Sequence, residues 1–198
     1  MSEQQLYDEI LKQKEQLQNL LQEHWELYSS MDTWFFWFNL ATIIIPLIIL
    51  YFLIDRRRLF EICFYGYTAH ILWLNTDIVL SNNNYLTHPH SISHILPQGF
   101  TITAVLFPVV FMLLYQYCTN NEKNFYLYAI IVSIIFACGA GGISGFVDLL
   151  RMHKGMNFFY LTLIDIVIAF IALWATKLFQ RIKHRTKQTS FNRKADEK

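Results

Sequence analysis

The residues best suited to chemistry are three histidines in the segment THPHSISH, residues 87–94. His88 and His90 form an H-x-H pair, and His94 follows four residues later. Imidazoles at this spacing can bind zinc or copper, with Asp77 or Asp148 as a further ligand, and they can also sense pH near neutrality. The segment itself contains no cysteine and no acidic residue. We therefore favour a third interpretation, a polar connector, which could cap an outward-opening cavity above Asp77.

A second group of polar residues interrupts the otherwise apolar stretch 59–80. The 4-3-4 spacing of one helical face joins Gly66, His70, Trp73 and Asp77. Ionisable side chains inside a membrane are costly and usually face the interior of a helix bundle. This face predicts either a ligand or proton site or a structural network of interhelical hydrogen bonds, and we favour the network.

Asp165 lies near the middle of the apolar stretch 156–177 and has no cation within reach on its own helix. An unpaired carboxylate in that position must be protonated or find a partner. Because their expected depths match, we expect Asp165 to pair with His70. The pairing would join the fifth apolar stretch to the second.

Small residues recur in the apolar stretch 125–149, where Ala137, Gly141 and Gly145 form a small-xxx-small row. Such a row allows two helix backbones to approach closely and implies no chemistry by itself. Asp148 continues the same face outward. We expect this face to pack against another helix of the bundle, or of a second copy.

The composition indicates that these residues must be positioned in lipid. Of the 198 residues, 54% are hydrophobic and only 16% are charged. A helix needs about 20 apolar residues to cross a hydrocarbon core of about 30 Å. Five stretches meet this length: 34–54, 59–80, 97–118, 125–149 and 156–177. The sequence thus predicts an all-α integral membrane bundle of five transmembrane helices.

The distribution of basic residues predicts the orientation of this bundle. With five spans, 12 of the 16 Lys and Arg residues fall on the side that holds Arg56–Arg58 and the C-terminal tail. Positive residues stay cytoplasmic, so the N-terminus should be outside and the C-terminus inside. The second span is retained for this reason, because deleting it would place Arg56–Arg58 and the tail on opposite sides. We expect a multi-pass protein of the cell membrane.

Two polar segments flank the bundle, and they divide the chain into residues 1–32, 33–178 and 179–198. Residues 3–30 contain no Gly or Pro and carry a 4-3 stripe of apolar residues in which Gln13 and His24 are the lapses. They predict an extracytoplasmic amphipathic or coiled-coil-like helix, which could pair with a second copy, lie on the outer membrane surface or cover the outer loops. Residues 179–198 predict a basic, disordered cytoplasmic tail.

The order of several features resembles a family of small five-span membrane proteins of Gram-positive, often spore-forming, bacteria. The features are the aromatic cluster Trp34–Trp37, Pro46, Asp77, Pro97, Pro108 and the run Tyr115-Gln116-Tyr117. The resemblance covers most of residues 20–180. It implies the five-span fold and its topology, and it implies no reaction, because no activity is established for that family.

No arrangement of residues typical of covalent catalysis or phosphate binding is found in the sequence. We expect a non-enzymatic bundle that binds a ligand or a partner, in contact with the lipid bilayer. It could form a homo-oligomer through residues 3–30 or the Gly141/Gly145 face, and we expect no cofactor and no nucleic acid. One alternative is a small ion- or proton-coupled transporter or channel that uses the membrane-embedded His and Asp residues. A second is an intramembrane enzyme or metal-binding protein.

Overall fold

The computed structural model describes the backbone of residues 1–196 and the side chains of residues 1–183. The elements are α1 (Glu3–Tyr28), α2 (Trp34–Leu53), η1 (Arg56–Arg58), α3 (Leu59–Asn82), β1 (Leu86–Thr87), η2 (Thr101–Leu106), α4 (Phe107–Asn120), α5 (Phe125–Phe146), β2 (Arg151–Met152) and α6 (Phe158–Asp196). The predicted all-α class is confirmed.

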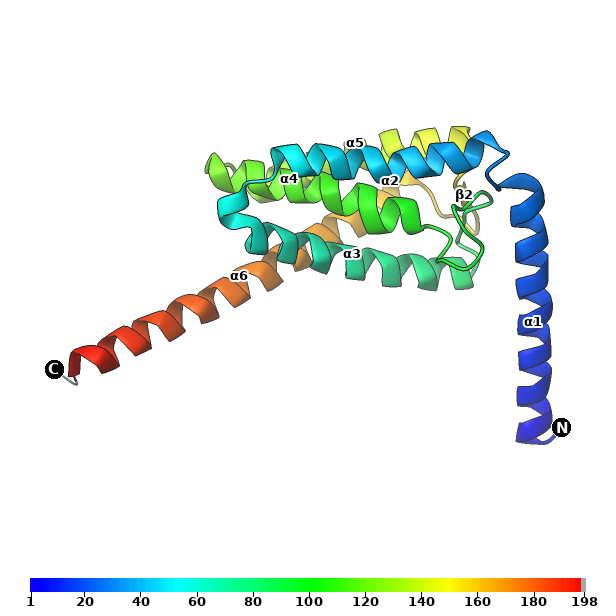
Figure 1. Ribbon diagram of the computed structural model, residues 1–198, viewed down its shortest axis with the longest axis horizontal. Helices are drawn as coiled ribbons and strands as arrows, with labels where there is room; N and C mark the ends of the chain where they lie inside the picture. The colour runs from blue at the N-terminus through cyan, green and yellow to red at the C-terminus, as the bar shows by residue number, and fades with distance from the viewer. Residues whose placement is uncertain (197–198) are drawn as a thin grey trace.

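Helices α2 to α6 form a bundle in which successive helices run in opposite directions (Figure 1). α3 packs against α4 and α6, α5 packs against the same two helices, and α2 packs against η2 and α4. α1 lies crosswise at one end of the bundle, which we call the α1 end (Figure 1). α6 extends beyond the opposite end, which we call the η1 end (Figure 1).

Four helices of the described chain are long and apolar enough to cross a membrane: Trp34–Leu53, Thr101–Asn120, Phe125–Phe146 and Phe158–Lys183. They coincide with the first, third, fourth and fifth predicted spans. α3 corresponds to the remaining span and has a similar length of 24 residues, but it does not meet the same criterion of hydropathy. Its polar interruptions, Glu61, His70, Asn75 and Asp77, account for the lower hydropathy.

Aromatic rings and a polar cluster close the η1 end. Tyr65 of α3 and Tyr115 of α4 stack with ring centroids 4.7 Å apart, and both side chains are buried. The Tyr115 hydroxyl donates to Glu61 at 2.6 Å, and Glu61 also pairs with Arg58. Arg58 donates to Thr119 at 2.8 Å. Arg58, which the sequence analysis uses only to predict the cytoplasmic side, therefore also joins α3 to the end of α4.

Two of the three small residues of the α5 row, Ala137 and Gly141, lie on its side toward α6, whereas Gly145 is exposed. Ala137 and Gly141 are buried, and a Cβ atom added to Gly141 would meet Phe158 at 3.4 Å and Leu161 at 3.8 Å. Gly145, further along, lies 3.7 Å by the same measure from the Leu150 carbonyl oxygen. The row therefore serves contact between α5 and α6 within one chain.

One local feature differs from the sequence prediction, because α6 continues to Asp196 across the segment that composition predicts to be disordered. Proline inside a helix removes one backbone hydrogen bond, yet α2 continues as one helix through Pro46, which is buried. Before Pro108, residues Thr101–Leu106 form a π-helix that leads directly into α4. This π-helix lies at the α1 end, beside the polar residues described next.

Candidate functional site

A buried hydrogen bond joins His88 to Asp77 at the α1 end of the bundle. His88 Nε2 lies 2.9 Å from Asp77 Oδ1, and the two side chains are only 6% and 2% exposed. Asp77 comes from the last two turns of α3, whereas His88 follows directly after β1. The pair therefore fastens the 83–100 segment to the helices. The sequence predicts that the histidine segment lies at the level of Asp77, but it does not predict which histidine meets it.

The short sheet explains why His88 points inward. Leu86 and Thr87 pair with Met152 and Arg151 in antiparallel register. Alternate residues of an extended segment point to opposite sides, so Leu86 and His88 are both buried, whereas Thr87 lies 3.0 Å from the ring of His153 on the outside. Two residues of β structure thus set the direction of the imidazole.

Gly99 provides the space in which the pair fits. A Cβ atom at Gly99 would lie 2.5 Å from Asp77 Oδ2 and 2.8 Å from His88 Nε2, and both distances are too short for ordinary contact. The Gly99 carbonyl also accepts from Thr103, through its backbone N–H at 3.0 Å and its hydroxyl at 2.9 Å. The backbone at Gly99 is therefore held against the His88–Asp77 hydrogen bond.

The π-helix next to this site explains the position of His70. In its register Phe107 N–H donates to the Ile102 carbonyl, so the Thr103 carbonyl would pair with residue 108, which is proline and has no N–H. His70 Nδ1 lies 3.4 Å from that carbonyl oxygen. Because a carbonyl only accepts, Nδ1 must carry the hydrogen in this contact. His70 thus compensates a backbone group that Pro108 leaves unpaired.

Asp165 has a different partner from the one expected. Its Oδ1 accepts from the indole N–H of Trp73 at 2.7 Å, and both residues are buried. The predicted pairing of Asp165 with His70 is wrong, because His70 turns toward η2 whereas Trp73, one turn further along α3, faces α6. One indole N–H is the only hydrogen bond to Asp165 in the described part of the chain.

A small cavity lies between the two aspartates. Its volume is about 40 Å³, which is sufficient for one water molecule, whose share of liquid volume is about 30 Å³. Trp73, Asp77, His88, Thr103 and Asp165 contribute its polar lining, and Phe136, Ala137 and Leu161 are among the apolar residues. The carboxylates of α3 and α6 therefore line the same cavity.

A larger cavity, of about 160 Å³, lies on the other side of His88. It lies among α2, the 83–100 segment, η2 and α5. Its polar lining residues are Asn39, Thr42, His88, His90, Gln98, Thr101 and Ser144. Its apolar lining residues are Phe38, Ile102, Leu106, Ala140, Ile143 and Leu149. His88 and Ile102 line both cavities and separate one from the other.

The two nitrogens of His88 have different environments. An ionised Asp77 can only accept, so Nε2 carries the hydrogen of their bond and the neutral ring has a bare Nδ1. No hydrogen bond to Nδ1 is found in the described part of the chain. The acceptor Nδ1 is therefore the group that His88 can offer to a molecule in the larger cavity. A carboxylate that orients an imidazole in this way is common at metal and catalytic sites.

His90 lies in a separate cluster, in which Ser29 contacts one nitrogen of its ring and Asp148 lies near the other. Ser29 Oγ is 3.0 Å from His90 Nδ1, and His90 Nε2 is 4.0 Å from Asp148. The three residue types are those of a serine-hydrolase triad, but their arrangement in space is not. Ser29 is 1% exposed, and Arg151 donates to both Asp148 oxygens at 2.6 Å. The cluster therefore ties α1 to the loops at the α1 end.

The charges around His90 have opposing effects on its protonation. Burial lowers the pKa of His90, the nearby Asp148 carboxylate acts to raise it, and His24 acts to lower it again. Hydrogen bonds from Arg151 hold the pKa of Asp148 below its ordinary range. The Phe35 ring stacks on His90 with centroids 3.6 Å apart. The docked state of α1 therefore favours a neutral His90.

The three histidines of residues 87–94 do not share a site. His88 bonds to Asp77, His90 contacts Ser29 and Phe35, and His94 packs against Trp25 with ring centroids 5.6 Å apart. Within the residues that the structure describes, no group of three or more His, Cys, Asp or Glu side chains is placed to hold a metal ion. The expectation of a metal site on His88, His90 and His94 is therefore not supported by their positions.

The other predicted site residues are distributed unevenly. Trp73, Asp77 and Asp165 converge on the small cavity, but Gly66 packs against Met112 of α4 and Asp148 lies outside it, paired with Arg151. The prediction overlooked Asn39, which donates to the His90 carbonyl and accepts from Thr101. Its position as the one amide within an apolar stretch was a usable signal.

Replacing Gly99 tests the close fit at the pair. Gly99→Ala should push Asp77 and His88 apart and lower the free energy of unfolding by about 1–3 kcal/mol, as overpacking does in other buried sites. Thermal unfolding in lipid nanodiscs measures the change. Gly139→Ala is the control, because a Cβ there meets nothing within 4 Å, so its stability should stay the same or rise. Equal stability of both variants would contradict the assigned geometry.

The pH dependence of α1 docking tests the His90 cluster. Because burial lowers the pKa of His90, docking should be fully stable above its ordinary pKa of about 6.5 and should weaken as the pH falls through the lowered value. The protection of residues 20–30 against hydrogen–deuterium exchange, relative to the intrinsic exchange rate at each pH, should therefore fall in acid. His90→Gln should remove this pH dependence. Higher protection in acid would mean that Asp148, rather than burial, controls His90.

Comparison with known proteins provides no relative from which a function could be transferred. No protein-family model matches the chain, no curated protein matches it, and no solved structure matches it. The function is therefore inferred from the cavities and the polar side chains that line them.

Proposed function

We propose that this chain is a five-helix integral membrane protein whose larger cavity binds a small molecule from the extracytoplasmic side. The observation that carries the proposal is the His88–Asp77 pair, which is buried between the helices and lies at the wall of that cavity. Burying such a pair costs free energy, because both polar groups lose their hydration. Cavities of mixed apolar and polar lining with one oriented imidazole are typical of ligand sites.

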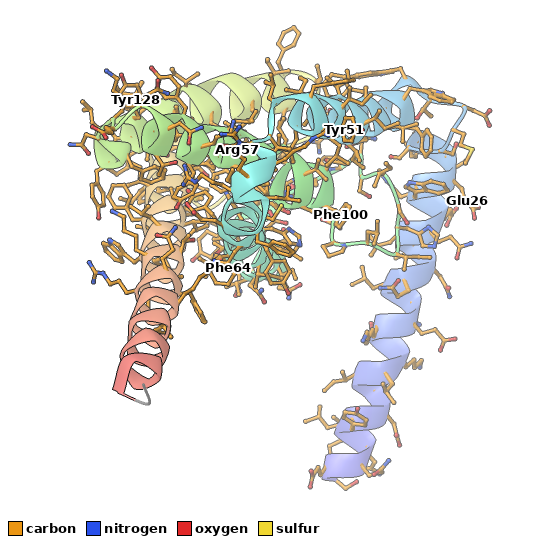
Figure 2. All side chains as sticks on the ribbon, turned by 60° about the vertical axis from the view of Figure 1, so that its left-hand side comes forward. Glu26, Tyr51, Arg57, Phe64, Phe100 and Tyr128 are labelled. Carbon is orange, nitrogen blue, oxygen red and sulfur yellow. The ribbon has the colours of Figure 1, made fainter. Side chains whose placement is uncertain are left out.

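The bundle geometry supports α3 as a fifth crossing helix. α3 lies alongside the four more apolar helices and packs against α4 and α6. It runs between the same two ends, and the chain termini lie toward opposite ends of the bundle (Figure 1). Of its polar interruptions, Asp77 is buried, Glu61 and His70 are partly buried, and Asn75 is exposed. In Figure 2, Arg57 marks the η1 end, which the basic residues favour as cytoplasmic.

The lining of the larger cavity indicates the chemical class of its ligand. An engineered apolar cavity of about 150 Å³ binds benzene, so a cavity of about 160 Å³ suits a molecule of similar size. Asn39, Thr42 and Thr101 are occupied by hydrogen bonds within the protein. His88 Nδ1 remains available as an acceptor, and no side-chain hydrogen bond to Gln98 or Ser144 is found in the described part of the chain. The fitting ligand is therefore a small, uncharged, mostly apolar molecule with at least one hydroxyl or similar donor.

A proton- or ion-coupled role is the second candidate, and the small cavity is the observation that favours it. This cavity joins the His88–Asp77 pair to Asp165, which has a single indole donor. A proton bound at His88 Nδ1 would give an imidazolium that the Asp77 carboxylate stabilises. Transfer through the small cavity would then reach Asp165, so proton flux in vesicles that depends on Asp165 would favour this candidate.

Cysteine labelling tests the five-span topology. In a background without native cysteines, Gln16→Cys and Ile95→Cys, both at exposed positions, should react with an impermeant maleimide in intact cells. Glu122→Cys should react only after permeabilisation. If α3 did not cross, residues 95 and 122 would exchange sides. Labelling of Glu122→Cys with protection of Ile95→Cys would therefore contradict the proposal.

Fluorine NMR with two probes tests the ligand site in nanodiscs. 4-Fluorophenol should bind saturably, and fluorobenzene about fivefold more weakly, because it lacks the donor and one hydrogen bond is worth about 1 kcal/mol. Ala140→Phe fills the cavity from α5 and should abolish binding of both probes. Ile135→Phe, on an exposed position of the same helix, should leave binding unchanged.

Two outcomes distinguish failure of the site from failure of the ligand class. Probe signals that do not saturate, or that are the same for Ala140→Phe and the unmodified protein, would show partition into lipid and contradict the site. Saturable binding of both probes with equal affinity would keep the cavity as a site but contradict the role of His88 as an acceptor.

A further inference from the structure

α1 presents a broad apolar arc, interrupted by Gln13, Lys14 and His24, and a polar arc on its opposite side. All its residues are at least partly exposed, and the exposed large apolar side chains are Leu6, Tyr7, Ile10, Leu11, Leu17, Leu20, Leu27 and Tyr28. Their spacing repeats at three to four residues, so they fall within one broad arc of the helix. Asp8, Glu15 and Glu26 occupy the opposite arc. Leu21 and Trp25, which are partly buried, belong to the apolar arc.

The C-terminal end of α1 is fixed against the bundle. Trp25 Nε1 donates to the Ser91 carbonyl at 3.2 Å, and its ring packs on His94. Ser29 is buried beside His90. These contacts hold the Trp25 side of the helix toward the 83–100 segment and leave the acidic arc away from it. Figure 2 shows Glu26 on the side of α1 that faces away from the bundle.

The start of α2 marks the level of the membrane surface. Trp34 and Trp37 are more than half exposed in its first turn, and indole rings prefer the membrane–water interface. α1 ends at Tyr28, only a few residues before Trp34, and runs crosswise to the bundle helices (Figure 1). A helix that leaves this level crosswise to the spans runs along the membrane surface.

A second copy is a less suitable occupant of the apolar arc. A dimer seam in the 4-3 register would contain Gln13 and His24, which weaken knobs-into-holes packing. His24 is also already engaged, with its ring 6.0 Å from His90 and 5.2 Å from Tyr28. The apolar arc is moreover wider than the two positions per heptad of a coiled-coil seam. Such a wide arc suits a lipid surface.

We propose that α1 binds the outer surface of the membrane, with its apolar arc inserted among the lipid headgroups and upper acyl chains. Interfacial helices of this kind bury their apolar face about 5–10 Å into that boundary. α1 carries six acidic residues and two lysines, so the lipid it fits is zwitterionic rather than anionic. Seated in this way, α1 would hold the 83–100 segment at the larger cavity through Trp25 and Ser29.

Spin labels on α1 in phosphatidylcholine nanodiscs test this proposal with the full-length chain. The native cysteines Cys63, Cys118 and Cys138 are replaced, and nitroxides are placed in two matched pairs, Ile10→Cys with Asp8→Cys and Leu17→Cys with Glu15→Cys. Collision with oxygen, which concentrates in lipid, is compared with collision with a water-soluble nickel chelate. The oxygen-to-nickel ratio should be several-fold higher at residues 10 and 17 than at residues 8 and 15.

Nanodiscs with phosphatidylglycerol added provide the charge control, in which the ratio at residues 10 and 17 should fall because the acidic helix is repelled. Equal, water-like ratios at all four positions would overturn the proposal. Spin–spin broadening at residue 17 that disappears on dilution with unlabelled protein would assign the apolar arc to a second copy instead. Neither outcome bears on the fluorine NMR result for the cavity, so the two proposals fail independently.

Discussion

The hydrogen bond between His88 and Asp77 is the interaction on which the α1 end depends. Both groups are almost completely buried, and breaking such a pair by removing one partner generally costs about 3–5 kcal/mol. The bond is possible because three separate segments agree: α3 presents the carboxylate, β1 turns the imidazole inward, and Gly99 leaves room beside them. Without it the 83–100 segment would still be held by β1 and by contacts with α1, α2, η2 and Lys154, but its inward-pointing imidazole would have no partner.

The same bond explains how a polar loop can form the wall of a cavity. His88 separates a larger space among α2, η2 and α5 from a small one that reaches Asp165. The π-helix η2 contributes Thr101, Ile102 and Leu106 to the larger space, and π-helical segments often occur at functional sites. Pro108 has no N–H to donate to the Thr103 carbonyl, and His70 donates to that carbonyl instead. The two histidines thus have different tasks, one directed to the cavity and one to the backbone.

Hydropathy and spacing were sufficient to predict the helices but not their cross-connections. The predicted spans 34–54 and 59–80 differ by one or two residues from α2 and α3, because lipid-facing length and helix period are local properties. The spacing that places Trp73 and Asp77 on one face of α3 was also recognisable in the sequence. The meeting of His88 with Asp77 depends on a two-residue strand paired with residues 151–152, a contact between distant segments without a local pattern. The matching expected depths of His70 and Asp165 led to the wrong pairing for the same reason. Which α3 side chain faces Asp165 depends on how the helix is rotated about its axis, and that side chain is Trp73.

The protonation state of His88 tests the account most directly. Nitrogen-15 NMR of the protein in lipid bilayers at neutral pH, with the His88 signals assigned by difference against His88→Gln, distinguishes the two neutral tautomers. The account predicts hydrogen on Nε2 and a bare Nδ1, and it predicts that Asp77→Asn abolishes this preference. Hydrogen on Nδ1 in the unmodified protein, or a tautomer that does not respond to Asp77→Asn, would contradict the pairing on which the site is built.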